Sequence, residues 1–313
     1  MRICMLGAGA LGSALGGVLT EGGHEVWLVD TWQAHVDAMN ARGLTLRDGG
    51  VDRTVKVRAR TSCDGIDPVD LVVVLTKSYH TRDAVVAARP IVGPETVVMS
   101  LQNGLGHEDI IAEIVGRERT LAGKTYTGGV MLEPGHVIAG TRGKETHIGE
   151  LDGRRSERVA RIAETFGRAG LATVASDNIL GTMWDKLQIN VATGALSGIT
   201  RLPYGGLYGV PEVHETALAA VRETIAVAKA LGVRLSNEDP EHAWKLAAAG
   251  LPPEFKASIL QSIEKGLPTE IDFINGSVVR GGERCGVPTP VNRTLVACVR
   301  GIELWMRAYA PPR

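Results

Sequence analysis

The sequence is short of aromatic residues, of net charge and of long apolar runs, and these shortages exclude several classes of protein. Phe, Trp and Tyr make up 4% of the 313 residues, and the net charge is −1 at pH 7. A nearly neutral chain lacks the basic surface of an electrostatic nucleic-acid binder. No apolar run approaches the roughly 20 residues that a membrane-spanning helix needs. We therefore expect a globular protein that has neither nucleic acid nor a membrane as its partner.

Cysteine is also scarce, and its spacing predicts no special chemistry. The four residues Cys4, Cys63, Cys285 and Cys298 are scattered and form no C-x-x-C pair. This spacing favours free thiols in a reducing cytoplasm over disulfides or a metal site. Arg2–Leu6 has the pattern of a β-strand rather than that of a signal peptide, which also favours a cytoplasmic protein. We expect no bound metal ion.

Glycine, by contrast, is abundant, with 39 residues, and 44% of the chain is hydrophobic. The length is sufficient for two domains of ordinary size. As far as residue 176, apolar strand-like runs alternate with helical segments, which predicts a doubly wound α/β domain. From about Asn178 onward only helical spacing is found. We therefore divide the chain into an α/β domain, residues 1–176, and an all-helical domain, residues 177–313.

Several shorter patterns support this division. Leu71–Leu75 and Thr96–Leu101 are continuous apolar runs, as expected for buried parallel strands. Asp48-Gly49-Gly50 lies between two β-prone runs and predicts a hairpin turn. Glycine and proline divide residues 121–148 into short β-prone runs, so we expect the sheet to end in antiparallel strands. In the second part, apolar residues recur at helical spacing in Glu212–Leu231 and Pro288–Ala308.

A glycine motif directly follows the first predicted strand. It leads into an amphipathic segment ending at Thr20 and a second strand at Glu25–Val29, which is the context that a dinucleotide-binding G-x-G-x-x-G motif requires. The first glycine allows the tight turn, the second lets a pyrophosphate approach the backbone, and the third permits close packing of helix on strand. The anion then lies at a helix N-terminus. We predict a Rossmann domain that binds a dinucleotide through Gly7, Ala8, Gly9, Ala10, Leu11 and Gly12. A plain glycine-rich turn is the alternative; FAD shares the motif, but the later residues favour nicotinamide.

Asp30 ends the second predicted strand. A carboxylate at this position can accept hydrogen bonds from the ribose hydroxyls of the adenosine, and it repels a 2′-phosphate. No arginine follows within Thr31-Trp32-Gln33 to compensate. Asp30 therefore favours NAD over NADP, unless it merely begins a turn.

Polar residues also follow two later strands. Leu71–Leu75 leads into Thr76 and Lys77, and Thr96–Leu101 leads into Gln102-Asn103-Gly104. Ligands of doubly wound sheets bind at the carboxyl ends of the strands, so Thr76, Lys77 and Asn103 are candidate cofactor contacts. Asn103-Gly104 is equally typical of a simple turn.

The helical part contains two candidate chemical groups. Lys186 and Asn190 are four residues apart and therefore share one face of a helix, where the lysine could protonate an oxygen while the amide holds a neighbouring group. The alternative is a surface lysine on a solvated helix. Further along, Thr269 is predicted to cap a helix that carries Glu270 in its first turn. Ser258 lies on the segment before it and, alone, is an ordinary helix serine.

Taken together, these residues resemble the ketopantoate reductase (2-dehydropantoate 2-reductase) family. The resemblance covers nearly the whole chain and is most specific at Trp184–Asn190 and in the stretch from Ser258 to Thr269–Gly276. It implies a Rossmann domain followed by a helical domain, and hydride transfer from a reduced nicotinamide to the keto carbon of a 2-oxo acid. The other matching segments are Gly7–Gly12, Thr76-Lys77, Gln102-Asn103-Gly104, Pro134-Gly135 and His147-Ile148-Gly149.

The resemblance implies a role for each matching residue. Lys186 would be the general acid, and Glu270 would contact the substrate and support catalysis. An ammonium group within hydrogen-bond reach can neutralise the alkoxide that hydride addition creates. The remaining roles are cofactor proximity for Lys77, placement of nicotinamide and substrate for Asn103, and substrate binding for Asn190 and Ser258.

Two positions depart from the family pattern. The family commonly has an asparagine four residues after the Asn190 position, where this chain has Gly194. The missing amide predicts room for a bulkier or less polar substrate. The family usually uses NADPH, which keeps NADP open, whereas Asp30 favours NAD.

Several alternatives therefore accompany the leading interpretation. One is an NAD-dependent D-2-hydroxyacid dehydrogenase of the same family that acts on another 2-oxo or 2-hydroxy acid. A 3-hydroxyacid dehydrogenase and a catalytically silent nucleotide sensor are further alternatives, although the site residues and the Thr269–Gly276 stretch argue against them. The expected partner is a small 2-oxo acid, and a homodimer is the candidate assembly.

Overall fold

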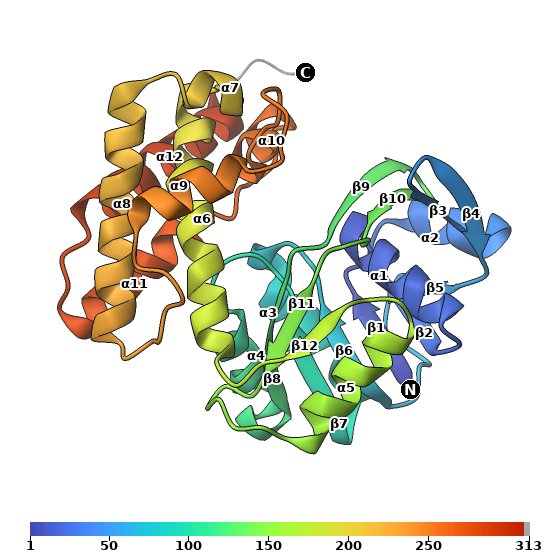
Figure 1. Ribbon diagram of the computed structural model, residues 1–313. Helices are drawn as coiled ribbons and strands as arrows, with labels where there is room; N and C mark the ends of the chain where they lie inside the picture. The colour runs from blue at the N-terminus through green and yellow to red at the C-terminus, as the bar shows by residue number, and fades with distance from the viewer. Residues whose placement is uncertain (310–313) are drawn as a thin grey trace. The chain divides into compact units, whose positions relative to one another are not determined.

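The computed structural model describes residues 1–309, which separate into two compact units (Figure 1). The N-terminal unit contains residues 1–102 and 107–179, and the C-terminal unit contains residues 103–106 and the chain from residue 180 onward. The short segment 103–106 thus belongs with the helical part of the chain, although it follows a strand of the N-terminal unit. No helix within the described residues is both long enough and apolar enough to cross a membrane.

The N-terminal unit alternates strands and helices. Its strands are β1 (Arg2–Leu6), β2 (Glu25–Val29), β3 (Leu44–Asp48), β4 (Val51–Val55), β5 (Arg58–Arg60), β6 (Val69–Val74), β7 (Val92–Ser100), β8 (Thr120–Thr125), β9 (Gly128–Glu133), β10 (His136–Gly140), β11 (Thr146–Gly149) and β12 (Thr173–Ala175). Its helices are α1 (Ala10–Glu21), α2 (Gln33–Arg42), α3 (Thr81–Ala87), α4 (His107–Val115) and α5 (Glu157–Arg168), with short 3₁₀ turns at η1 (Ser78–His80), η2 (Arg89–Ile91) and η3 (Arg117–Arg119).

The main sheet has the strand order β12-β11-β8-β7-β6-β1-β2-β5. Strands β8, β7, β6, β1, β2 and β5 are parallel, which confirms the predicted doubly wound α/β architecture. Val72, Val73 and Val74 of β6 are fully buried, because helices cover such a sheet on both faces. At the far end β11 runs antiparallel to β8, as predicted. The carboxyl ends of β1, β6 and β7, which are neighbours, therefore meet at one edge.

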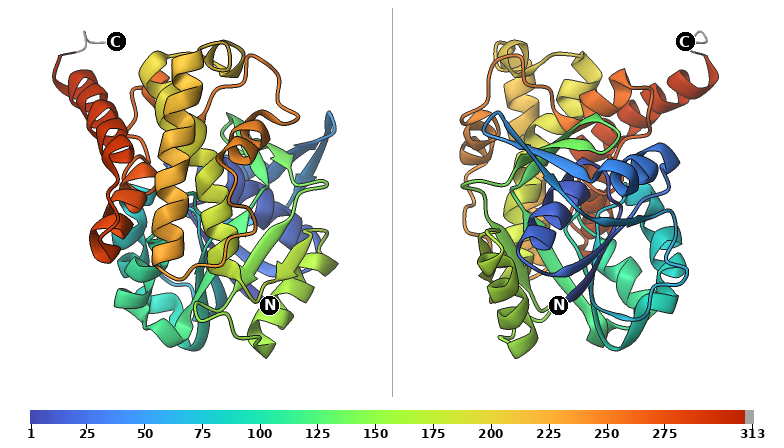
Figure 2. Two further views of the ribbon diagram at one scale, coloured as in Figure 1. Left: turned by 60° about the vertical axis from the view of Figure 1, so that its left-hand side comes forward. Right: turned by 90° about the vertical axis from the view of Figure 1, so that its right-hand side faces the viewer.

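A second sheet, with the order β4-β3-β10-β9, lies against α1 (Figures 1 and 2). The predicted hairpin at Gly49-Gly50 joins β3 to β4. The pairing of β10 with β3 was not predicted, because these strands are about ninety residues apart in the sequence. A Cβ on Gly16 would lie 2.9 Å from Met5 in the main sheet, and one on Gly17 would lie 2.9 Å from Leu46 in the second. Helix α1 is therefore buried on both sides, and the expectation of an amphipathic helix was wrong.

The C-terminal unit is helical, as predicted: every regular element described from residue 180 to residue 309 is a helix. Its core is a single apolar cluster that includes Trp184, Leu187 and Val191. Its helices are α6 (Ile179–Thr200), α7 (Tyr204–Leu207), α8 (Pro211–Ala230), α9 (Pro240–Ala248), α10 (Ser258–Glu264), α11 (Asn275–Cys285) and α12 (Pro290–Ala308).

The predicted helix start at Thr269 was wrong. Residues 270–274 form turns, and α11 begins only at Asn275. Asp272 accepts a hydrogen bond from Arg300 Nη2 at 2.7 Å on its Oδ1. The Thr269 hydroxyl donates to Glu303 Oε1 at 2.6 Å. Thr269 Oγ1 also accepts a hydrogen bond from Ile271 N–H at 3.3 Å, as a helix cap would, but only turns follow it.

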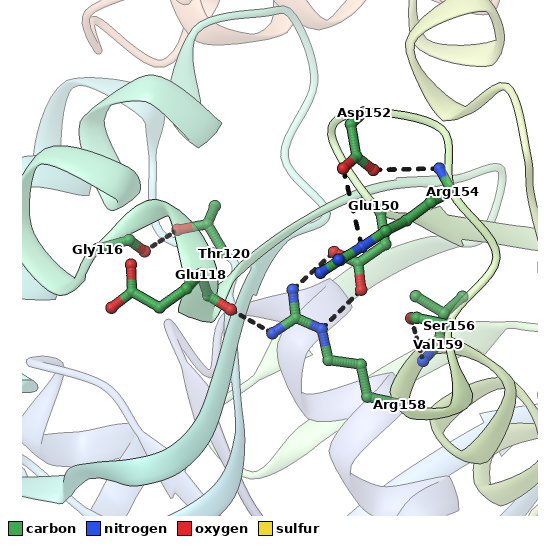
Figure 3. A network of polar contacts seen from close by, with 9 residues as sticks. All are labelled: Gly116, Glu118, Thr120, Glu150, Asp152, Arg154, Ser156, Arg158 and Val159. Carbon is green, nitrogen blue, oxygen red and sulfur yellow. Dashed lines mark hydrogen bonds and ion pairs between the residues drawn. The ribbon is translucent and has the colours of Figure 1, made fainter.

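A polar network joins the end of β11 to α5 and η3 (Figure 3). The carboxylate of Glu150 accepts hydrogen bonds from Arg158 Nε at 2.7 Å and Nη2 at 2.6 Å, and Arg158 Nη1 donates to the Glu118 carbonyl. The Glu150 side chain is 5% exposed. A carboxylate so deeply buried is stable only with a paired, hydrogen-bonded cation.

Candidate active site

The glycine turn between β1 and α1 has the geometry that the dinucleotide-binding G-x-G-x-x-G motif requires. Gly7 has φ +98°, and a Cβ there would lie 2.5 Å from the Thr76 backbone nitrogen. A Cβ on Gly12 would lie 3.1 Å from the Gly7 carbonyl carbon, so this position allows helix and turn to pack closely. A Cβ on Gly9 would meet nothing within 4 Å. The turn is thus crowded at its first and third glycines and open at its second.

The open side of this turn suits an anion. Gly9 is the N-cap of α1, whose first turn contains no acidic residue. The unsatisfied N–H groups of a helix N-terminus favour negative charge. Gly7 N–H and Ala8 N–H donate to the Val29 carbonyl at 2.9 and 3.0 Å and so hold the turn on β2. The buried hydroxyl of Thr76, which follows β6, has no hydrogen-bond partner among residues 1–309. A pyrophosphate fits this arrangement.

Asp30 lies at the carboxyl end of β2 beside a basic residue that sequence reasoning missed. Asp30 is half-buried, and its Oδ1 accepts a hydrogen bond from Trp32 N–H at 3.0 Å. Its own N–H donates to the Arg60 carbonyl at 3.1 Å. The exposed Arg60 pairs with Val29 across the parallel β2–β5 ladder. Only the pairing of the three-residue strand β5 with β2 brings Arg60 here, and sequence spacing gave no indication of it.

The ends of β6 and β7 are joined by Gln102, which is 6% exposed. Its Nε2 donates to the Thr76 carbonyl at 2.7 Å and lies 2.9 Å from Thr81 Oγ1. Gln102 therefore holds the backbone of Thr76 beside the glycine turn. Lys77 is exposed.

Helix α6 presents Lys186 and Asn190 on one face. Both are half-buried and lie one helical turn apart, roughly 6 Å along the axis. The face that carries Asp185 and Gln188 is occupied: Asp185 accepts from Ser236 N–H at 3.1 Å, and Gln188 donates to the Asn237 carbonyl at 3.3 Å. Since successive residues turn by about 100°, Lys186 and Asn190 point to a different side.

The same stripe continues to Gly194, whose neighbour is Ile259. Ser258 is the first residue of α10, and Ile259 beside it packs against α6. A Cβ on Gly194 would lie 3.4 Å from Ile259 Cδ1, and a Cβ on Gly198 would lie 2.6 Å from Ile259 Cγ2. Ile259 thus lies beside both glycines, leaving space for a Cβ at Gly194 and none at Gly198. The expectation of extra room for a bulkier substrate stays a prediction; spacing along one helix did not reveal that Ile259 is the neighbour.

The segments that carry Asn103 and Glu270 contact each other. Leu105 N–H donates to the Phe273 carbonyl at 2.9 Å, and a Cβ on Gly104 would lie 2.7 Å from the Phe273 carbonyl carbon. Asn103 is exposed and Glu270 is half-buried. The backbone carbonyl of Glu270 accepts hydrogen bonds from Phe273 and Ile274. The C-terminal unit thus contains all five proposed substrate and catalytic residues: Asn103, Lys186, Asn190, Ser258 and Glu270.

The four cysteines are free thiols, as expected. Cys4 and Cys63 are buried in one apolar cluster. In the part of the chain that the structure describes, no three His, Cys, Asp or Glu side chains are grouped so as to hold a metal ion.

The fold and these residues define a nucleotide-dependent oxidoreductase with an α/β and a helical unit. The family model described as ketopantoate reductase PanE/ApbA matches residues 3–153, and its C-terminal counterpart matches residues 178–303. Together they cover most of the chain. The chain therefore belongs to the ketopantoate reductase family, as the sequence resemblance implied.

Relatives and solved structures agree with this membership. The 2-dehydropantoate 2-reductase of Pyrococcus horikoshii is 37% identical over 97% of this chain and 98% of its own length. A PanE/ApbA family ketopantoate reductase from Ralstonia eutropha JMP134 has a TM-score of 0.90 and 36% identity, covering 98% of this chain and all of the other. A D-mandelate dehydrogenase solved with NADH and anilino(oxo)acetate also reaches 0.90, at 28% identity and the same coverage.

Proposed function

We propose that this protein is a 2-dehydropantoate 2-reductase: it transfers a hydride from a reduced nicotinamide to the keto carbon of a 2-oxo acid. The similarity along the full chain to relatives of that name, at 37% identity, carries the proposal. The N-terminal part, residues 1–176, is the proposed dinucleotide-binding domain. The helical part, residues 177–313, together with Asn103, supplies the groups for substrate binding and catalysis.

The residues have distinct proposed tasks. Bound at the glycine turn, the dinucleotide supplies the hydride. Lys186 donates a proton to the keto oxygen as negative charge develops on it, which stabilises the transition state more than the ground state. Glu270 orients the ammonium and substrate, Asn190 and Ser258 bind the acid, and Asn103 places its keto group. These roles are supported by the shared face of Lys186 and Asn190 and by the link between the Asn103 and Glu270 segments.

NADH is the proposed preferred cofactor. The Asp30 carboxylate at the end of β2 suits ribose hydroxyls and opposes a 2′-phosphate. The positive charge of Arg60, which lies beside Asp30, attracts a 2′-phosphate and so keeps the preference for NADH small. The D-mandelate dehydrogenase with a TM-score of 0.90 was solved with NADH, which is consistent with an NADH-using chain on this fold.

A homodimer in the cytoplasm is the proposed physiological form. Exposed apolar side chains near the end of α12, Leu304 and Trp305, favour self-association, and the free cysteines suit a reducing compartment. Light scattering on the purified protein tests the dimer directly.

The decisive assay follows NADH and NADPH oxidation with a panel of 2-oxo acids. Three substrates are informative: ketopantoate, 3,3-dimethyl-2-oxobutanoate, which lacks only its terminal hydroxyl, and phenylglyoxylate, the 2-oxo acid of mandelate. We expect the highest kcat/KM for ketopantoate. Efficient reduction of phenylglyoxylate with negligible activity on ketopantoate would instead support the D-2-hydroxyacid dehydrogenase, the alternative that the comparisons do not favour.

A further inference from the structure

His35 on α2 has an unusual environment for a histidine beside a nucleotide site. The residue has no solvent-exposed surface, yet both ring nitrogens have polar partners. Nε2 lies 3.0 Å from the Ala8 carbonyl oxygen and 3.0 Å from Ser13 Oγ, and Nδ1 accepts a hydrogen bond from Gly135 N–H at 2.9 Å. One ring thus connects the glycine turn, helix α1 and the turn between β9 and β10.

These contacts determine which nitrogen of the neutral ring carries the proton. A backbone N–H can only donate, so Nδ1, which faces Gly135, must carry a lone pair. The ring proton of neutral His35 therefore resides on Nε2 and points to Ala8 O. The Ser13 hydroxyl donates to the same carbonyl at 2.7 Å. Two donors from buried side chains thus hold this one oxygen atom.

Holding the Ala8 carbonyl also determines the direction of the next N–H group. In a trans peptide, the carbonyl oxygen of one residue and the N–H of the following residue point in opposite directions. The Ala8 oxygen is directed inward, to His35 and Ser13, so the Gly9 N–H is directed outward. A Cβ on Gly9 would also meet nothing within 4 Å, so the backbone at this residue has open space beside it.

We propose that His35 is a positioning residue of the dinucleotide site, which in its neutral form aims the Gly9 N–H at the cofactor pyrophosphate. The inference rests on the proposed function in one respect, that a dinucleotide binds at the Gly7–Gly12 turn. His35 does not touch the cofactor; it acts through the Ala8–Gly9 peptide.

The surroundings of His35 oppose its protonation. Burial lowers its pKa most, while the Ala8 carbonyl and the Asp30 carboxylate raise it by less, so that the pKa lies below its ordinary value. A second proton would sit on Nδ1 and face the Gly135 N–H, which breaks that hydrogen bond. Cofactor affinity should therefore be constant at neutral pH and decrease as the pH falls through the lowered pKa of His35, which lies below the ordinary value of about 6.5.

The other charged groups on the elements around His35 have partners of their own. Their pairs are Glu21 with Arg53 on α1, Asp37 with Gln33 and Arg42 with the Pro134 carbonyl on α2, and Glu133 and Asp52 with His136 at the β9–β10 turn. Asp30 is thus the carboxylate whose charge acts on His35.

Three substitutions separate positioning from packing. In His35→Gln the side-chain amide can still donate to the Ala8 carbonyl, in His35→Asn it can serve only the Gly135 N–H, and His35→Leu makes neither bond. We measure the Kd of NADH by fluorescence titration, kcat with the 2-oxo acid, and Tm. Loss of a buried hydrogen bond should raise the Kd roughly tenfold in the Asn and Leu variants, whereas the Gln variant stays within about threefold. In all three variants kcat should remain near that of the wild type.

A control on the same helix excludes a general loss of stability. Asn40 ties α2 to β5 through two hydrogen bonds with Ala59 and does not touch the glycine turn. Asn40→Leu should lower Tm without changing the Kd. The pH profile gives a second signature: the Kd of the wild type should rise at acid pH as His35 takes up a second proton, and that of His35→Gln should not, because an amide does not titrate.

The outcomes are distinguishable. Unchanged NADH affinity in His35→Leu, or an equal loss in Asn40→Leu, would overturn the positioning role while the proposed oxidoreductase stands. If the wild type binds neither NADH nor NADPH, the dinucleotide site itself is wrong, and this inference falls with it.

Discussion

Leu105 and Phe273 are joined by a backbone hydrogen bond of 2.9 Å, although they lie 168 positions apart in the chain. The Asn103 segment therefore belongs to the helical unit and lies next to the segment that carries Glu270. Gly104 makes this approach possible, because any side chain there would press on the Phe273 carbonyl.

Gly104→Ala should therefore disturb substrate handling. A Cβ would lie 2.7 Å from the Phe273 carbonyl carbon, so the segment must move and displace Asn103. We expect the KM for the 2-oxo acid to rise about tenfold or more, in line with the sensitivity of reactions to small misplacements. Gly106→Ala is the matched control, since Gly106 has a similar positive φ but its Cβ would only approach Arg280 at 3.8 Å. Equal kinetics for the two variants would argue against a positional role of this contact.

Lys186→Ala should lose turnover while retaining the cofactor. Its proposed proton donation acts in the transition state, so kcat should fall by roughly 10²-fold or more, with little change in NADH affinity. Lys229→Ala, which removes a surface lysine paired with Glu238, should behave like the wild type. A kcat near that of the wild type in Lys186→Ala would return this residue to the role of a surface lysine.

Asp30 and Arg60 should shift cofactor preference in opposite directions. Removing the carboxylate in Asp30→Ala relieves repulsion of the 2′-phosphate and should narrow the preference for NADH. Arg60→Ala removes the neighbouring positive charge and should widen it. The ratio of kcat/KM values for NADH and NADPH is measured in both variants. A wild-type ratio in favour of NADPH would refute the argument from Asp30, and no change in Arg60→Ala would exclude Arg60 from the site.

Two glycines of α6 should respond differently to alanine. At Gly194 the new Cβ makes an ordinary contact of 3.4 Å with Ile259, so the better helix propensity of alanine should raise stability by up to about 1 kcal/mol. At Gly198 the Cβ would lie 2.6 Å from the same side chain, and overpacking should cost about 1–3 kcal/mol. Urea unfolding of both variants measures the difference. Equal stabilities would show that Ile259 adjusts freely.

The Glu150–Arg158 pair should give stability that depends on pH. Burial raises the pKa of Glu150, but the hydrogen bonds from Arg158 and Ser156 and the charge of Arg158 lower it further, so the net shift is downward. A depressed acid stabilises the fold above its ordinary pKa of about 4.3, and this contribution is lost as the pH falls through the folded-state value. Glu150→Gln should cost about 3 kcal/mol at pH 7, the lower end for a broken buried pair.

The matched control for this pair is Asp152→Asn. Asp152 lies 3.7 Å from Arg154 in the same network, but both side chains are more than 60% exposed (Figure 3). The substitution Asp152→Asn should lower the free energy of unfolding by less than about 1 kcal/mol. Chemical unfolding between pH 7 and pH 3 should show the gap between wild type and Glu150→Gln closing toward acid. A gap that is constant with pH would show that the pair contributes by packing and not by charge.

The sequence predicts those features of the fold that depend on local periodicity. The run from Leu71 and the helical spacing after Pro288 were sufficient to place β6 and α12, and the glycine motif marked the turn before α1. Pairings between distant segments were not predictable. The union of β10 with β3, the approach of Arg60 to Asp30 and the coverage of Gly194 by Ile259 all depend on tertiary packing.

In the candidate site, too, the features set by local spacing were predictable and those set by tertiary packing were not. Lys186 and Asn190 share a face because helical spacing alone requires it, and α6 has that spacing. The helix start at Thr269 was mispredicted because this segment is held by Glu303 and Arg300 on a distant helix, which the local pattern does not reveal. Nothing in the sequence indicated a role for His35, since a single histidine on a helix forms no motif.

The adjacent glycines Gly16 and Gly17 limit which fragments of the N-terminal unit could fold on their own. These two glycines allow α1 to pack against both sheets. The second sheet is complete only when residues 128–140, which form β9 and β10, are present. A peptide that ends after β2 would carry the whole glycine motif, but the outer side of its helix would be apolar and uncovered. During synthesis the nucleotide turn therefore cannot reach its final support until the chain has extended past Gly140. For the same reason, a graft of the first thirty residues onto another Rossmann scaffold would need a polar outer face in place of Gly17 and its neighbours.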